Sequence, residues 1–125
     1  GDYMTLNYEI STVKLPSDAK AGKDGPPAGA DVWVLLEKKG NYFEVAQASL
    51  APLDPRPGRV LARGTIAHDF RGRAGDTRVI YGIERYFVPE GKGTPAFKLM
   101  EIELSVSPEH RLYIRRVLLD GVAYP

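Results

Sequence analysis

The chain has 125 residues, the usual size of one compact domain, and its 43% hydrophobic content is sufficient for one core. Seventeen basic and sixteen acidic residues give a net charge of +1, which excludes the strong field of a nonspecific nucleic-acid binder. The lack of cysteine excludes disulfides, thiolate nucleophiles, iron–sulfur clusters and cysteine-based zinc sites.

A strand is predicted at the start of the chain, over Gly1–Ser11 and on to about Val13 or Leu15, because apolar and polar residues alternate there. The apolar face would consist of Met4, Leu6, Tyr8 and Ile10. No run of about eighteen apolar residues, the length of a membrane-spanning helix, occurs in the sequence. Because the chain begins with glycine inside a strand pattern, we expect a natural N-terminal segment, such as a targeting or anchoring segment, to precede it.

Two loops are predicted in the first half of the chain. Residues 16–30 contain no aliphatic residue larger than alanine, which is typical of a long surface insertion. A lid or a partner-contact loop is the alternative interpretation of this segment. Residues 51–58 contain prolines that block both helix formation and strand pairing.

A β-hairpin is predicted between these loops. Val32–Leu36 and Tyr42–Ala46 are rich in β-branched and aromatic residues, and Gly40-Asn41 is a typical hairpin turn. Trp33 would lie on the opposite strand face from Val32, Val34 and Leu36. We expect Trp33 to be a second-layer core residue or, alternatively, a stacking platform for a ligand.

The second half of the chain predicts further strands. They are expected at Arg59–Ala67, at Thr77–Val88, and in a final hairpin of Ile102–Val106 and Leu112–Leu119 that ends at Asp120-Gly121. A short helix is expected through Ala96–Met100, because Thr94 suits an N-cap and Pro95 suits the first helical position. About seven strands, one short helix and no βαβ alternation predict a mainly β fold. The expected architecture is an antiparallel sandwich or small barrel, in a single domain over residues 1–125.

The stretch Tyr81–Gly91 holds the first candidates for a functional site. In a strand, Glu84 and Arg85 would lie on opposite faces, each among apolar neighbours. A half-buried charge is costly unless it is paired, so each would need a partner from another strand. One interpretation is a structural salt bridge or a strand rim. The other places Glu84 in a polar pocket with Tyr8 and Tyr86, as an acid, a base or a ligand anchor.

No catalytic residue, cofactor or metal site is predicted. No sequence feature identifies a serine or threonine nucleophile that could act with His68-Asp69. The positions of His68 and His110 match no known spacing of metal ligands. Glu90–Gly93 lacks the Gly-Lys-Ser/Thr ending of a phosphate-binding loop. The arginines of residues 71–78 interleave with aspartates, which indicates a solvated turn and not a phosphate or nucleic-acid contact.

Two stretches together resemble a known family. Gly1–Tyr8 reads Gly-Asp-Tyr-Met-Thr-Leu-Asn-Tyr and matches the pattern that names the bacterial GDYXXLXY protein family. Tyr81–Gly91 is similar to the second characteristic stretch of that family, although Arg85 stands where a small residue is expected. The hairpin Val32–Val45 and the ending Leu118–Gly121 lie where family members have comparable segments. The resemblance therefore covers most of the chain.

The resemblance implies a location more than an activity. Family members carry one transmembrane helix shortly before the GDY motif, with the remainder outside the cytoplasm, and often accompany a multi-pass membrane protein. The leading hypothesis is a non-catalytic, membrane-tethered extracytoplasmic domain, on the periplasmic or cell-surface side, that binds a partner membrane protein or envelope component. The alternatives are a small-ligand binder or hydrolase with a polar pocket near Tyr8 and Glu84, and a rigid spacer. The candidate binding residues are Asp2, Tyr3, Tyr8, Glu84 and Tyr86.

A weaker resemblance concerns the fold. The β-rich core of signal peptidases and LexA-type self-cleaving repressors also has a Gly-Asp strand start, a strand similar to Asp31–Val34, and a strand near an Arg-Gly like Arg63-Gly64. The lysine base of those proteins falls in this third region, where the present chain reads Leu-Ala-Arg-Gly at residues 61–64. A peptidase activity is therefore not expected.

Overall fold

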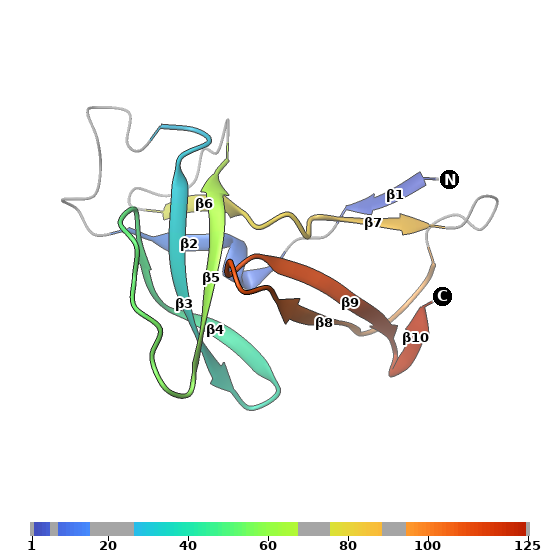
Figure 1. Ribbon diagram of the computed structural model, residues 1–125. Coiled ribbons are helices and arrows are strands. Elements are labelled where there is room, and N and C mark those ends of the chain that lie inside the picture. Colours follow the sequence, from blue (N-terminus) through green and yellow to red (C-terminus); the bar gives the residue numbers. More distant parts are fainter. Residues whose placement is uncertain (1, 6–7, 16–26, 68–75, 89–94, 125) are drawn as a thin grey trace. The chain divides into compact units, whose positions relative to one another are not determined.

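The computed structural model describes residues 2–5, 8–15, 27–67, 76–88 and 95–124, with residues 2–5, 87 and 88 described by their backbone (Figure 1). Contacts divide the chain into two compact units. The central unit is Asn7–Tyr81, and the flanking unit combines Gly1–Leu6 with Gly82–Pro125. Both units are built from antiparallel strands, which confirms the predicted mainly β fold. The expectation of a single domain stays a prediction.

The central unit contains one five-stranded antiparallel sheet. A 3-10 helix, η1 (Glu9–Ser11), precedes five strands: β2 (Thr12–Lys14), β3 (Asp31–Lys39), β4 (Tyr42–Ser49), β5 (Arg59–Ile66) and β6 (Asp76–Ile80). The strand order is β2-β6-β5-β3-β4, so that β2 and β4 are the two edges. The predicted hairpin is confirmed as β3 and β4, whose turn contains Gly40 with a positive φ of 61°.

The core of the central unit lies on the sheet face that the alternating hairpin pattern predicts. Val32 and Val34 on β3 are fully buried there, and Leu36 continues the row. The other buried apolar side chains of the central unit include Ile10, Val13, Leu15, Ala48, Ala62, Ile66, Val79 and Tyr81. On the opposite face Leu35 is paired directly with Leu61, and both are also buried. The middle of the sheet is therefore shielded from water on both sides.

The five-stranded sheet is strongly curled. In Figure 1, β2 and β6 run steeply across β3 and β5, and Cα atoms of the two edge strands approach within 8 Å of one another. Gly64 permits close contact between β5 and β6, because a Cβ atom there would lie 2.5 Å from Cγ1 of Val79 and 2.7 Å from the carbonyl oxygen of Ile80. A bulge leaves Ala46 of β4 without a partner in β3, and bulges bend strands.

The flanking unit contains two smaller sheets. β1 (Asp2–Thr5) pairs antiparallel with β7 (Arg85–Val88). β8 (Met100–Val106), β9 (Leu112–Leu119) and β10 (Val122–Tyr124) form a three-stranded sheet in the order β10-β9-β8. The hairpin predicted from residues 102–119 is confirmed as β8 and β9. No helix in the described ranges is long and apolar enough to cross a membrane.

The strand predicted over the first eleven residues is wrong in its second half. β1 ends at Thr5, and Glu9–Ser11 forms η1, in which the N–H of Ser11 donates to the carbonyl oxygen of Tyr8 at 3.1 Å. Ile10 and Ser11 are both buried although they are neighbours in the sequence. A strand would point them to opposite faces, whereas a helical turn brings both toward the core.

Two later predictions also need correction. The strand expected over Thr77–Val88 is broken between β6 and β7, where Gly82 has a φ of +89° that other residues rarely adopt. The helix expected through Ala96–Met100 is absent, and Met100 instead begins β8. The N–H groups that a helix would use are bonded to Asp120, as described below. The described residues contain ten strands in place of about seven.

Candidate functional site

Asp2 and Tyr3 lie on β1, in the family-like start of the chain. Their backbones pair with Val88 and Phe87 of β7. The side chains of Asp2 and Tyr3 lie outside the described part of the structure. Their proposed binding role stays a prediction, while their strand placement is established.

Tyr8 lies directly before η1 in the central unit, and its side chain is half-buried. Its backbone is extended, with φ −125° and ψ 152°, and its carbonyl oxygen accepts the N–H of Ser11. Tyr8 therefore marks the point where the extended chain turns into the helical turn.

Glu84 forms a local contact across the break between β6 and β7. Its Oε1 accepts the N–H of Gly82 at 2.9 Å, and the side chain is half-buried. The carboxylate therefore stabilises a bend in the main chain. Arg85, the other charge of this stretch, is exposed and so carries no burial penalty.

Tyr86 of β7 joins two sheets of the flanking unit. Its hydroxyl group donates a hydrogen bond of 2.9 Å to the carbonyl oxygen of Tyr124 on β10 in a partly buried position. Among the five candidate residues, Asp2, Tyr3, Glu84 and Tyr86 belong to the flanking unit and Tyr8 to the central unit. A pocket that combines Tyr8 with Glu84 and Tyr86 stays a prediction.

His68-Asp69 lies outside the described residues, and within them no group of three or more His, Asp and Glu side chains is close enough to hold a metal ion. The Arg116 guanidinium donates two hydrogen bonds to the Glu103 carboxylate, at 2.7 and 2.8 Å, and lowers the pKa of that carboxyl group. This pair lies on the exposed surface of β8 and β9.

Three exposed apolar residues lie in the backbone segments that meet at the turn between β9 and β10. We call Phe97, Leu99 and Val122 the turn patch; they are 43%, 48% and 70% exposed. Val122 is paired with Leu119, which also pairs with Met100 at the start of β8. The turn patch therefore lies at one end of the three-stranded sheet.

Asp120 organises the backbone beneath the turn patch. Its Oδ1 accepts the N–H groups of Lys98 and Leu99 at 3.0 and 2.8 Å, and its own N–H donates to the carbonyl oxygen of Leu99 at 2.8 Å. Asp120 and Gly121 have positive φ values of 50° and 85°, as a two-residue hairpin turn requires. Lys98 and Leu99 are therefore held on the surface by three hydrogen bonds to one residue, two of which involve Leu99.

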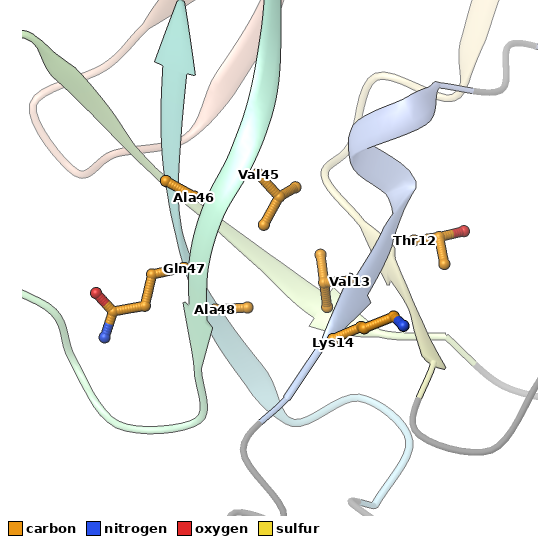
Figure 2. A pocket seen from close by; sticks show the side chains of 7 residues that line it. All are labelled: Thr12, Val13, Lys14, Val45, Ala46, Gln47 and Ala48. Atoms are coloured by element: carbon orange, nitrogen blue, oxygen red, sulfur yellow. The ribbon is translucent and has the colours of Figure 1, made fainter.

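A second feature lies between the two edges of the five-stranded sheet. We call it the edge cleft; it measures about 280 Å³ and is lined by Thr12–Lys14 of β2 and Val45–Ala48 of β4. Figure 2 shows Val13, Val45 and Ala48 pointing into the space between the two strands, while Lys14 and Gln47 point away from it. Its side-chain floor is therefore apolar, and main-chain atoms of two edge strands form its sides.

Trp33 is half-buried, as its second-layer prediction requires, and is covered on one face. The guanidinium carbon of Arg63 lies 4.6 Å from the centre of the indole ring, on the directly paired position of β5. Such cation–π contacts contribute about 0.5–1 kcal/mol at exposed sites. Because the guanidinium occupies this face, no ligand ring can stack there without displacing Arg63.

A comparison with known protein families matches residues 1–117 to the family described as "GDYXXLXY protein". The chain belongs to the GDYXXLXY family. A search of curated proteins and a search of solved structures find no match. The suggested likeness to the signal peptidase and LexA-type core therefore has no support from solved structures.

The GDYXXLXY motif is divided between the two units. Asp2 and Tyr3 of the motif lie in β1, and its final Tyr8 belongs to the central unit before η1. The motif was recognisable from the sequence, whereas the role of Asp120 beneath the turn patch was not predicted. Asp-Gly between two apolar stretches is a strong hairpin signal, and it would have identified both β10 and the role of Asp120.

Proposed function

We propose that this GDYXXLXY protein is a non-catalytic, membrane-tethered binding domain that works outside the cytoplasm and docks onto a partner membrane protein through the turn patch. The observation that carries the proposal is the exposure of Phe97, Leu99 and Val122 around one ordered turn. Scattered exposed apolar residues are normal, whereas a cluster on a rigid element is typical of interaction surfaces.

The rigidity of the turn patch supports this role. Binding carries an entropic cost for every side chain and loop that it orders. The hydrogen bonds from Asp120 order the backbone of Lys98 and Leu99 before any partner arrives. The apolar character of the patch favours a protein surface over a polar envelope polymer, because the centres of protein interfaces are depleted of charge.

The location rests on the family resemblance. A transmembrane helix before the GDY motif would keep the β units close to the membrane, where a multi-pass partner is within reach. Protease accessibility of the full-length protein in intact and permeabilised bacteria tests this part of the proposal. Cleavage of the β units without permeabilisation of the inner membrane is expected, and protection would contradict it.

Co-purification tests the docking surface. The full-length protein is extracted from membranes in mild detergent as the unmodified chain and with Leu99→Asn or Val122→Asn. We expect the unmodified protein to retain a membrane protein partner in stoichiometric amount, and each variant to lose most of it. Truncating a hot-spot side chain of an interface lowers affinity by about 2 kcal/mol or more, roughly thirtyfold.

Val106→Asn is the matched control. Val106 is also exposed, but it lies at the other end of β8 from Met100. We expect this variant to retain the partner. Recovery of the unmodified full-length protein as a lone monomer, or equal loss of the partner in all three variants, would overturn the proposal.

A further inference from the structure

The two edges of the five-stranded sheet carry an inference that deepens the proposed function and therefore rests on it. β2 and β4 each have one hydrogen-bonded neighbour, and no backbone hydrogen bond joins them to one another. Unpaired N–H and C=O groups along a sheet edge are a template for an additional strand. We propose that the free edge of β4, together with the edge cleft, binds an extended segment of the partner protein as an added β-strand.

The chemistry of the edge cleft favours a polypeptide backbone as the ligand. The side chains that point into the cleft are Val13, Val45 and Ala48, which are all apolar, whereas Lys14 points away (Figure 2). The polar groups on both sides are therefore those of the main chain, which repeat every two residues, about 6.6 Å, along a strand. An extended peptide has the matching repeat of donors and acceptors, and one of its apolar side chains can cover Val45, which is half-buried, whereas Val13 and Ala48 are already buried.

The width of the edge cleft determines how the segment is placed. A strand lying between two others requires them to be about 9.6 Å apart, twice the normal spacing. β2 and β4 approach within 8 Å, so a complete strand does not fit between them at their closest point. The segment therefore pairs with the first half of β4, and only its end enters the edge cleft. The cleft volume of 280 Å³, about that of nine waters, is enough for such an end.

Side chains beside the free edge suit this arrangement. Tyr42 and Phe43, at the start of β4, are exposed and point to alternate faces of the strand. An added strand along this part of β4 would find one aromatic side chain on each of its faces. Cross-strand pairs that contain an aromatic residue stabilise a sheet.

The first experiment uses peptides as probes for the chain of residues 1–125. Random linear eight-residue peptides are displayed and selected on the chain, and the enriched peptides are titrated into the isotope-labelled protein and followed by NMR. We expect the largest amide shifts in residues 42–48 and 12–14. N-methylation at alternate peptide positions should weaken binding at least fivefold, about the value of one amide hydrogen bond, while methylation at the intervening positions has little effect.

Two variants of Ala46 test the protein side of the contact. Ala46 has no partner in β3, so proline there removes one N–H of β4 without removing a paired residue, and bulges tolerate proline. We expect Ala46→Pro to weaken the selected peptides at least fivefold and Ala46→Ser, which keeps the N–H, to bind normally. The NMR spectrum shows whether each variant is folded. If Ala46→Pro is unfolded, the N-methylated peptides still test strand addition on the unmodified chain.

Three outcomes would overturn strand addition: no peptide is enriched, shifts are confined to the turn patch, or no N-methyl position matters. The proposed function fails separately. If full-length Ala46→Pro retains its partner while Leu99→Asn loses it, docking at the turn patch stands and strand addition by the partner is overturned. If Ala46→Pro loses the partner while Leu99→Asn retains it, strand addition is supported and the turn patch is not the docking surface.

Discussion

The hydroxyl group of Tyr81 donates a buried hydrogen bond of 2.6 Å to the carbonyl oxygen of Ile10. Tyr81 is the last residue of the central unit, and Ile10 lies in η1 near its start. Both side chains are buried, so water does not replace this bond. The contact links two segments that are 71 residues apart and fixes the helical turn against the end of the sheet.

Tyr81→Phe tests the value of this link. The substitution keeps the ring but leaves the carbonyl oxygen of Ile10 without its donor, which in a buried site costs about 1–3 kcal/mol. We expect the free energy of unfolding in urea to fall by that amount. Tyr113→Phe is the control, because Tyr113 is exposed and its variant should unfold as the unmodified chain does. Equal stability of both variants would contradict the role of the Tyr81 hydroxyl group.

Gly64→Ala tests the close contact of β5 and β6. An added methyl group would meet the carbonyl oxygen of Ile80 and the side chain of Val79, and the first of these is backbone that does not rotate away. Overpacking of this kind typically costs about 1–3 kcal/mol. We expect a lower thermal midpoint and altered amide shifts in β5 and β6. An unchanged midpoint would show that the strands separate more easily than the geometry indicates.

Asp120→Ala tests how the turn patch is held. The substitution removes the acceptor of two N–H groups and places alanine at a positive φ, so we expect a loss of about 1–2 kcal/mol. Amide hydrogen exchange at Lys98 and Leu99 should accelerate. Asp120→Asn keeps an acceptor oxygen and tolerates the left-handed conformation, so its exchange rates should stay close to those of the unmodified chain. If amide exchange at Lys98 and Leu99 stays slow in both variants, the proposed organisation is contradicted.

Arg116→Gln tests the electrostatics of the exposed pair on β8 and β9. The pKa of Glu103 is lowered first by the hydrogen bond from Arg116 and also by the charges of Arg116 and Arg115. Because the folded-state pKa is lowered, the pair stabilises the fold above the ordinary glutamate value of about 4.3, and this contribution is lost as the pH falls through the lowered pKa. NMR titration of the Glu103 carboxyl group should show its pKa rising toward the ordinary value in Arg116→Gln. A smaller rise is expected in Arg115→Gln, and equal effects of both substitutions would contradict the assignment.

The hairpins and the strand β5 were predictable because local signals agree with the final packing there. Gly40-Asn41 forms the turn between β3 and β4, and the alternation of Val32, Trp33 and Val34 matches their burial. Where the turn residues and the strand pattern agree in this way, the structure of a segment can be predicted from its sequence. The fold class followed from these elements.

The failures occur where contacts distant in sequence override the local pattern. The alternation in the first eleven residues continues through Ile10, yet the bond to Tyr81 and the burial of Ser11 favour a helical turn. Similarly, Thr94-Pro95 favours a helix start, but Asp120 captures the N–H groups of Lys98 and Leu99. No residue within either segment signals these partners.

The contacts of the candidate residues were not predictable from the sequence. A pocket around Glu84 and Tyr86 stays a prediction; the structure adds that Glu84 Oε1 accepts the N–H of Gly82 and that the Tyr86 hydroxyl group donates to the carbonyl oxygen of Tyr124. The turn patch and the edge cleft depend on which strands pair and which remain edges. That information arises from the sheet order, which one sequence does not reveal.

The pairing of β1 with β7 has a consequence for how the protein is made. Asp2 pairs with Val88, so the strand that begins the family motif has no partner until the whole central unit has left the ribosome. At about 5–20 residues per second, this wait is on the order of ten seconds, far longer than a hairpin such as β3–β4 needs to form. During synthesis, β1 therefore stays without its β7 partner while the central unit folds.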